Sequence, residues 1–346
     1  MNRSGPVRQE SGGLPKAEPE REAERGPLLE VRDLRVSFHH DGRTVRAVDG
    51  IGYSLGAGRA LAIVGESGSG KTVSARSLLG LLPPGGVVES GSALFQGRDL
   101  LAMPAKELRS VRGNQVAMVF QNAMEALNPT VTLRRQLTEH LRWHGICGRR
   151  EAEERAAQAL SDVDIPEPKR RLGMYPFQLS GGMRQRALIA MAMVTRPKLL
   201  IADEPTTAVD VTVRRQLIDL LCRLKESGTA IIMITHDLGV AKALCDDVLV
   251  MYAGRQAEHG ATADVVANPL HPYTAGLLRS SVEVGGADKP LRPIPGTPPD
   301  LSDLPPGCPF QPRCTHAEPD ACSQPQPSRS PVPGREVACW LPEVGS

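Results

Sequence analysis

The stretch GESGSGKT at residues 65–72 carries the most specific chemical pattern in this sequence. It satisfies the phosphate-loop pattern in full, and it lies between an apolar run and a helical pattern, as such a loop requires. Backbone amides of the loop wrap phosphate oxygens, the lysine meets the β- and γ-phosphates, and the threonine hydroxyl meets Mg²⁺. The stretch predicts a nucleoside triphosphate site formed by Gly65, Glu66, Ser67, Gly68, Ser69, Gly70, Lys71 and Thr72.

Two acidic residues follow a second apolar run, LLIA at residues 199–202. A buried strand would deliver Asp203 to its carboxyl end, where ligands bind in open α/β sheets. Asp203 is then placed to hold Mg²⁺ or its water, and Glu204 to polarise an attacking water as a general base. An isolated acidic pair is often only a solvated turn. The phosphate loop in the same chain favours the catalytic interpretation.

Gln121 and His236 also follow apolar runs, VAMVF at 116–120 and AIIMIT at 230–235. Parallel strands bring their carboxyl ends to one edge of a sheet, so both side chains should lie near Lys71 and Glu204. At that place His236 could contact the γ-phosphate. Either residue alone would mean little, and the prediction rests on the whole set.

A second glycine turn, LSGGMRQR at residues 179–186, opens into another helical pattern. Backbone N–H groups and the helix dipole favour an anion at a helix start. This chain therefore carries two turns suited to phosphate, and a single nucleotide site needs only one of them.

The elements that must position these residues alternate along the chain. Buried parallel strands are predicted at 60–65, 116–120, 199–202, 230–235 and 248–252. Helices are predicted at 71–81, 151–162, 184–195, 211–226 and 238–245. Two further segments, 28–38 and 44–55, show partial period-two alternation and are predicted to be antiparallel strands. The alternation predicts an α/β fold with a mostly parallel sheet.

Three segments fall outside this alternation. Residues 1–27 are polar and rich in Pro, Gly and Glu, which predicts a disordered tail. Residues from about 122 to 180 show helical patterns without a strand, which predicts a helical subdomain. Residues 263–346 are rich in Pro, Gly and short turns, which predicts an irregular C-terminal extension.

Composition sets limits on the class of protein. The chain has 346 residues, of which 40 % are apolar and 23 % charged, as in ordinary globular proteins. A net charge of +2 and 3 % aromatic residues give no reason to expect nucleic acid as a partner. No apolar run approaches the roughly 18 residues of a spanning helix, and the N-terminus lacks the apolar region of a signal peptide. We therefore expect a cytoplasmic location.

Four cysteines gather near the C-terminus with the spacing C-x5-C-x7-C-x16-C: Cys308, Cys314, Cys322 and Cys339. In a chain expected in the cytoplasm, such a cluster favours a metal centre over disulfides. Four thiolates suit an iron–sulfur cluster or zinc, but no C-x2-C pair identifies a zinc fold. Four structural cysteines without a ligand remain an alternative.

The motifs together resemble those of the ATP-binding cassette (ABC) ATPases. The phosphate loop, Gln121, LSGGMRQR, LLIADEP, Asp210 and His236 stand in the order and type of that family, over about residues 28–260. The most specific element is LSGGMRQ. In that family two chains pack head to tail, and the second turn of one chain caps the γ-phosphate held by the other. One chain with two phosphate turns would then supply half of each of two sites.

The resemblance also implies roles for individual residues. Lys71 would bind phosphate, Thr72, Gln121 and Asp203 would meet Mg²⁺, and Glu204 would be the base. Catalytic roles are implied for Glu204, His236 and Gln121. Residues implied to act across the dimer, or at its seam, are Ser180, Gly181, Gly182 and Asp210. The aromatic ring that stacks on adenine should fall near Phe38. Val209 departs from the leucine that the family more often has before the aspartate.

Longer segments resemble the ATP-binding subunits of peptide permeases, a group that includes nickel permeases. They are VFQNAMEALNP, YPFQLSGGMRQRALIAMAM, MITHDLGV, HPYTAGLL, IPGTPPDL and GCPFQPRC, and they extend the resemblance to residues 28–341. It divides the chain into a nucleotide-binding domain, 28–262, and a C-terminal extension, 263–346. It also favours a [4Fe–4S] cluster over zinc, because some members with this cysteine pattern carry one.

The resemblance implies an ATPase subunit that energises import of di- or oligopeptides across the cytoplasmic membrane. Its partners would be two permease subunits, a second ATPase subunit (itself or a paralogue) and an extracytoplasmic substrate-binding protein. It would lie on the cytoplasmic face of the membrane. Alternatives are import of nickel or another small solute, or a soluble ABC ATPase acting on DNA or the ribosome. DNA-acting members have long insertions before the second turn, and ribosomal members have two cassettes, and this chain has neither.

Overall fold

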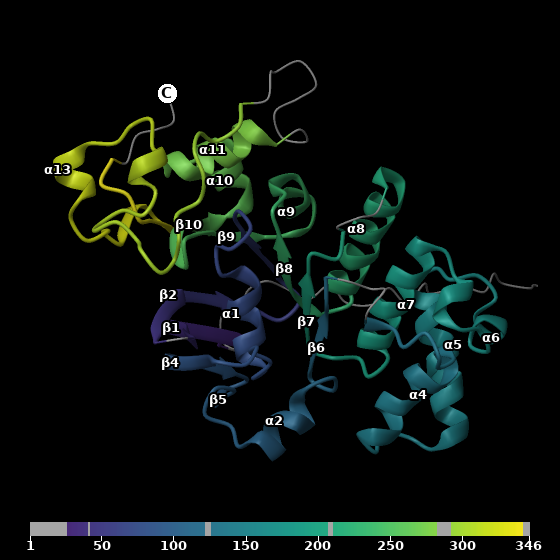
Figure 1. The fold of residues 1–346 in the computed structure, drawn as a ribbon. Helices are drawn as coiled ribbons and strands as arrows, with labels where there is room; N and C mark the ends of the chain where they lie inside the picture. The colour runs from purple at the N-terminus through teal and green to yellow at the C-terminus, as the bar shows by residue number, and fades with distance from the viewer. Residues whose placement is uncertain (1–25, 41, 122–125, 207–209, 282–291, 342–346) are drawn as a thin grey trace, which may run out of the picture.

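The computed structural model describes residues 26–40, 42–121, 126–206, 210–281 and 292–341. All but the last two residues of the expected tail, 1–27, lie outside these ranges. Two sheets form the framework: an eight-stranded sheet, in the order β11-β12-β10-β9-β3-β8-β7-β6, and a four-stranded antiparallel sheet beside it (Figure 1). No described helix is long and apolar enough to cross a membrane.

Five adjacent parallel strands, from β9 to the edge strand β6, make up most of the larger sheet, and they confirm the prediction from apolar runs. They are β3 (Ala60–Val64), β6 (Val116–Val119), β7 (Leu199–Asp203), β8 (Ala230–Thr235) and β9 (Asp247–Tyr252). Every residue of β3, β7 and β8 is buried, as expected for strands covered on both faces. Connecting helices are α1 (Lys71–Leu78), α8 (Val211–Glu226) and α9 (Leu238–Leu244).

The antiparallel sheet has the order β2-β1-β4-β5. Its first two strands, β1 (Leu29–His40) and β2 (Arg43–Leu55), confirm the predicted pair. Sequence analysis missed β4 (Gly86–Phe95), β5 (Arg98–Asp99) and the short helix α2 (Ala105–Val111). β4 is largely exposed over its first half, so it carries little of the apolar pattern that identifies a strand.

The described part of the helical subdomain contains helices and no strand, as predicted. It comprises α4 (Leu133–Trp143), α5 (Arg149–Asp162), α6 (Pro168–Arg171) and the 3₁₀ turn η2 (Pro176–Gln178), and it leads into α7 (Gly181–Met193). Figure 1 shows these helices together beyond β6, at one end of the larger sheet.

The C-terminal extension is more regular than its composition predicts. Just before it, β10 (Arg255–Ala261) runs antiparallel to β9; within it, β12 (Arg335–Val337) pairs with β10 and β11 (Arg329–Val332) pairs with β12. Its helices are α10 (Thr262–Ala267), α11 (Pro272–Ser280), α13 (Pro319–Cys322) and the 3₁₀ turn η3 (Gln311–Arg313). Tyr273 and Phe310 belong to the same buried cluster as Val64 of β3, so the extension packs into the main core.

Candidate functional site

The phosphate loop joins β3 to α1 and fits tightly against two other segments. Gly70 caps α1 with φ 96°, and a Cβ there would lie 2.2 Å from the Ala47 carbonyl oxygen. A Cβ on Gly65 would lie 2.2 Å from the Met251 carbonyl oxygen. Both positions therefore require glycine, Gly70 for its left-handed backbone as well as for space.

Lys71 is buried within the loop, with 5 % of its surface exposed. Its ammonium donates to the carbonyl oxygens of Gly65 and Glu66, both at 2.7 Å. Burial lowers the pKa of Lys71, and the nearby carboxylates of Glu204, Asp203 and Glu66 oppose that shift. Lys71 is thus a buried ammonium with three rotatable donors, which is the chemistry that suits phosphate oxygens.

Asp203, the last residue of β7, meets Thr72 beside the loop. The Thr72 hydroxyl donates to Asp203 Oδ1 at 2.9 Å, while Asp203 Oδ2 accepts no hydrogen bond from the described residues and lies 3.8 Å from Nη2 of Arg76. Burial raises the pKa of Asp203, and the Thr72 hydroxyl and Arg76 lower it. The Thr72 hydroxyl and the buried Asp203 carboxylate, whose Oδ2 accepts no described hydrogen bond, together form a set of oxygen ligands that fits Mg²⁺.

Glu204 lies between Gln121 and His236. The amide Nε2 of Gln121 donates to Glu204 Oε2 at 2.9 Å, and Nδ1 of His236 lies 3.6 Å from Glu204 Oε1. Glu204 has φ 46°, and its backbone N–H donates to the Ile234 carbonyl oxygen at 2.9 Å. The ends of β6, β7 and β8 therefore bring these three side chains together, as the sheet-edge argument predicts.

The second glycine turn lies at the start of α7, in the group of helices beyond β6 (Figure 1). The Ser180 hydroxyl accepts from the Met183 N–H at 3.3 Å, and a Cβ on Gly181 would meet open space. In the part of the chain that the structure describes, no hydrogen bond or ion pair joins Ser180 to the phosphate loop. Because the start of α7 is exposed and Ser180 makes no described bond to the phosphate loop of the same chain, this turn is available to bind another molecule.

Two other predicted residues also lie apart from the loop. Asp210 caps α8, accepting from the Val213 N–H at 2.9 Å, and Val213 also packs over Gly182 of α7. Phe38 is half-buried in β1, with its ring against Gly86 of β4. Neither residue shares a hydrogen bond or ion pair with residues 65–72 among the described contacts.

Sequence analysis missed three residues that hold the site. The Glu66 N–H donates to the Tyr273 hydroxyl at 2.8 Å, and the Arg313 guanidinium pairs with the Glu66 carboxylate. Gln185 of α7 donates to the Pro205 carbonyl oxygen at 2.7 Å, next to Glu204. All three stand in motifs noted above: HPYTAGLL and GCPFQPRC, which only a resemblance singled out, and LSGGMRQR, which was identified as a phosphate turn without reference to Gln185. No spacing rule connects them to the loop.

The four C-terminal cysteines gather in one place. The Cys308 N–H donates to the Cys322 carbonyl oxygen at 2.8 Å, and burial raises the pKa of the Cys308, Cys314 and Cys339 thiols, the last to about 11. Neighbouring thiols contribute to each of these shifts. However, among the described residues no three histidine, cysteine or acidic side chains are arranged to hold a metal ion.

Two family models match this chain. One, described as ABC transporter, matches residues 48–207, and one, described as the oligopeptide/dipeptide transporter C-terminal region, matches residues 257–322. The oligopeptide transport ATP-binding protein OppD of Salmonella typhimurium is 50 % identical over 316 residues, covering 91 % of this chain and 94 % of its own. The dipeptide transport ATP-binding protein DppD of Bacillus subtilis is 46 % identical over 319 residues, with coverage of 91 % and 94 %.

A solved structure shares the cassette fold. It is a dimeric, post-hydrolysis state of the ATP-binding cassette MJ0796 bound to ADP and phosphate. It superimposes with a TM-score of 0.61 at 24 % identity, covering 68 % of this chain and 99 % of the other.

Proposed function

This chain belongs to the ATP-binding proteins of the ABC transporter family, and on that premise we propose that it hydrolyses ATP to energise the import of di- or oligopeptides. The substrate class is supported by the names of two relatives that match over nine-tenths of this chain, and by the match of the extension itself.

The proposal that this chain hydrolyses ATP rests on the position of Glu204. Its carboxylate is held by Gln121 and faces His236, at the same sheet edge as Lys71. In the proposed reaction, water attacks the γ-phosphorus, the bond to the bridging oxygen of ADP breaks, and Glu204 accepts the proton of the water. His236 is assigned to the γ-phosphate and Lys71 to the β- and γ-oxygens.

Thr72, Asp203 and Gln121 are the residues that would hold Mg²⁺. The metal would neutralise charge on the β- and γ-phosphates. Thr72 and Asp203 share a hydrogen bond at 2.9 Å, so their oxygens lie side by side. Phe38 is proposed to stack on adenine.

The second glycine turn is assigned to a neighbouring ATPase subunit, which is a second copy or a paralogue. Ser180, Gly181 and Gly182 would cap the γ-phosphate on the partner's loop, and Asp210 would lie at the seam. This assignment is supported by the exposed start of α7 and by the absence of a described bond between Ser180 and its own loop.

The other proposed partners are two membrane permease subunits and, through them, an extracytoplasmic substrate-binding protein. The chain would then sit peripherally on the cytoplasmic face of the membrane. Exposed aromatic residues support a docking surface: Phe120, next to Gln121 in the chain, is 37 % exposed, and Phe177 of the helical subdomain, 64 % exposed, stacks on Tyr175.

Vesicles test the function directly. They should contain this chain together with permease subunits and a substrate-binding protein of the peptide-import type, and ATP should drive uptake of labelled peptide. Glu204→Gln should abolish that uptake. Uptake of Ni²⁺ and not of peptide would reject the proposed substrate class while leaving the ATPase assignment intact.

For the cysteines we propose a [4Fe–4S] cluster, with zinc as the alternative. Four thiols that gather in the C-terminal extension are the right donor set, although no three of the described side chains are arranged to hold a metal ion. Protein purified without air should contain iron and acid-labile sulfide at about four atoms each per chain. Stoichiometric zinc without iron would assign a structural zinc site, and no metal would leave Cys308, Cys314, Cys322 and Cys339 as packing residues.

A further inference from the structure

The C-terminal extension bonds directly to the phosphate loop through Arg313. Its guanidinium makes a two-point contact with Glu66, from Nη1 to Oε2 at 2.6 Å and from Nη2 to Oε1 at 3.0 Å. The Arg313 side chain is only 5 % exposed, so this is not a solvated surface pair. Paired, charged hydrogen bonds of this kind fix orientation as well as distance.

Arg313 is itself fixed by the extension and by β9. Its Nε donates to the Pro295 carbonyl oxygen at 2.8 Å and its Nη1 to the Tyr252 hydroxyl at 3.2 Å. The guanidinium also lies over the rings of Tyr252 and Phe310, 5.8 and 6.0 Å from their centroids. The hydrogen bonds to Glu66 raise the pKa of Arg313, so the guanidinium keeps its positive charge.

A second contact holds the backbone at the same residue. The Glu66 N–H donates to the hydroxyl of Tyr273, which is fully buried in α11. The Tyr273 ring packs against Tyr252 and Phe310, with centroids 4.5 and 5.3 Å apart. The extension therefore holds both the side chain and the main chain of one loop residue.

The charge of Glu66 matters because of where it lies. Glu66 is itself a residue of the phosphate loop, and its carbonyl oxygen accepts from the Lys71 ammonium at 2.7 Å, so its carboxylate lies beside the place where triphosphate oxygens must enter. An unpaired carboxylate there would repel ATP, and Arg313 neutralises it.

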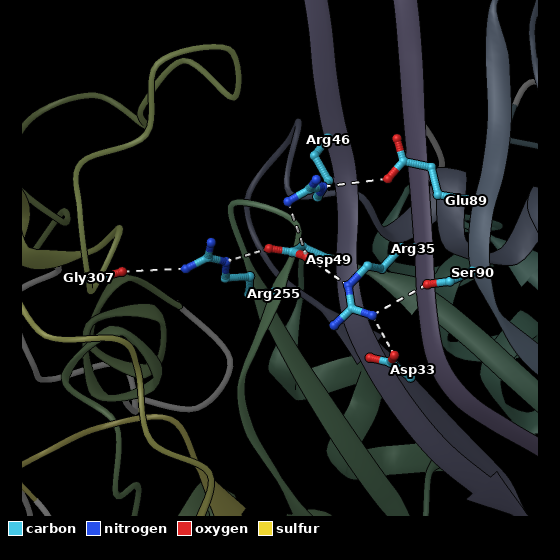
Figure 2. A network of polar contacts seen from close by, with 8 residues as sticks. All are labelled: Asp33, Arg35, Arg46, Asp49, Glu89, Ser90, Arg255 and Gly307. Carbon is cyan, nitrogen blue, oxygen red and sulfur yellow. Dashed lines mark hydrogen bonds and ion pairs between the residues drawn. The ribbon is translucent and has the colours of Figure 1, made fainter.

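Arg313 also connects the loop to the cysteine lobe, defined here as residues 307–322. It directly precedes Cys314 in the chain. Figure 2 shows a second link at the other end of the lobe, where Arg255 donates to Asp49 Oδ2 at 3.0 Å and to the Gly307 carbonyl oxygen at 3.4 Å. Asp49 of β2 also accepts from Arg35 at 3.2 Å, so this end is bonded to the antiparallel sheet.

We propose that Arg313 is a positioning residue for ATP: it holds and neutralises Glu66, so that the folded cysteine lobe sets the affinity of the phosphate loop for nucleotide. The proposal rests on the ATPase function proposed above. It adds that nucleotide affinity depends on a part of the chain outside the cassette motifs.

The first experiment is a nucleotide titration of Arg313→Gln, with steady-state ATP hydrolysis alongside. We expect affinity for ATP to fall by about 10- to 100-fold, the range for a charged hydrogen-bonded pair. KM should rise more than kcat falls, because Arg313 does not touch the reacting atoms. Arg329→Gln is the matched control, since Arg329 lies in the same extension but donates to the Trp340 carbonyl oxygen.

A double variant separates this role from simple packing. In Arg313→Gln the Glu66 carboxylate is left unpaired, so adding Glu66→Gln should restore part of the lost affinity. Arg313→Lys, which keeps the charge but not the two-point contact, should lie between parent and Arg313→Gln. It also serves as the test variant should Arg313→Gln fail to fold. A folded Arg313→Gln with unchanged affinity, or a double variant no better than the single one, would overturn the proposal.

Gly307→Ala tests the contribution of the lobe. A Cβ there would lie 2.2 Å from the Cys322 carbonyl oxygen, so the substitution distorts the lobe without touching the nucleotide site. Weaker ATP binding is expected. Unchanged ATP binding, in a variant whose lobe has become sensitive to protease, would contradict coupling between lobe and loop. A parent protein that binds but does not hydrolyse ATP would instead reject the proposed ATPase function.

Discussion

Glu204 occupies a backbone conformation that residues with a side chain rarely adopt. Its φ of 46° is stabilised by the bond to Ile234 and by the Gln121 amide on its carboxylate. Such conformations cost about 1–3 kcal/mol and persist where the surrounding structure fixes them, often at functional sites. The strained residue here is the proposed base.

Glu204→Gln should keep ATP binding and nearly abolish turnover. The amide cannot accept the proton of water, so kcat should fall by about 10²- to 10⁴-fold, while the phosphate loop is unchanged. Phosphate release measures the first effect, and a nucleotide titration measures the second. Lys71→Ala is the contrasting variant and should weaken binding itself. Phosphate release close to that of the parent would remove Glu204 from its assigned role.

Asp203→Asn should make the protein without ligand more stable above neutral pH. Burial raises the pKa of Asp203, so the folded state favours the protonated form, and ionisation opposes folding once the pH exceeds the ordinary value near 4. The gain in melting temperature should therefore shrink as the pH falls toward about 4. Adding Mg²⁺ and ATP should stabilise the parent more than the variant. A variant less stable than the parent at pH 8 without ligand would contradict this account.

At the scale of elements, helix α11 places a buried histidine and Tyr273 next to each other. His271 caps the helix because its ring Nδ1 accepts from the Tyr273 N–H at 3.0 Å, and its backbone N–H donates to the buried Glu258 carboxylate at 3.0 Å. Burial lowers the pKa of His271 to about 4. A neutral ring is therefore part of the structure that presents Tyr273 to the phosphate loop.

Acidification should loosen this helix. The pKa of His271 is lower in the folded state than its ordinary value of about 6.5. The contribution of the neutral ring to the free energy of unfolding is therefore complete above about pH 6.5 and is lost as the pH falls toward 4. The loss is about 1.4 kcal/mol per pH unit over that window. His271→Asn, which can still cap the helix, should show a shallower fall of melting temperature with acid. His316→Asn, at an exposed site, should follow the parent, and equal slopes for all three proteins would disprove the role of His271.

The sequence could predict those helices and strands that are marked by a residue pattern within the element itself. The five parallel strands are continuous apolar runs because both faces are covered, and their ends carry Gln121, Asp203, Glu204 and His236 to one edge. β10 and β12 were missed because only part of each is buried and β12 has three residues. Their pairing, such as Glu258 with Val337, depends on partners far along the chain. The same holds for Arg313 and Glu66, where no local pattern predicts the contact.

At the scale of the whole molecule, two phosphate turns in one chain predict two shared sites in a dimer. Ser180→Arg should leave ATP binding to the separated chain nearly intact, because the phosphate loop is untouched. It should prevent closure of the dimer, since the bulky side chain blocks the start of α7. If Ser180→Arg abolishes ATP binding to the monomer, the turn serves its own chain and the shared-site assignment fails.

Mixing variants sharpens this test for a homodimer. A pair of one Ser180→Arg chain and one Lys71→Ala chain has one site with both lesions and one with neither, so some hydrolysis should return. No return of activity on mixing, with the mixed dimer shown by cross-linking, would contradict the homodimer. If the partner is a paralogue, Ser180→Arg should disable the site whose phosphate loop lies in the paralogue.

The bond between Arg313 and Glu66 also orders events during biosynthesis. The two residues are 247 positions apart, so at about 5–20 residues per second the loop emerges roughly 12–50 seconds before its partner is made. Throughout that interval the nascent chain holds an unpaired carboxylate at the entrance for ATP. Translation that stops before Arg313 thus yields a polypeptide that contains every cassette motif but has a lower affinity for nucleotide. We expect such truncated chains to be incorporated into assembled transporters less often than the full-length chain.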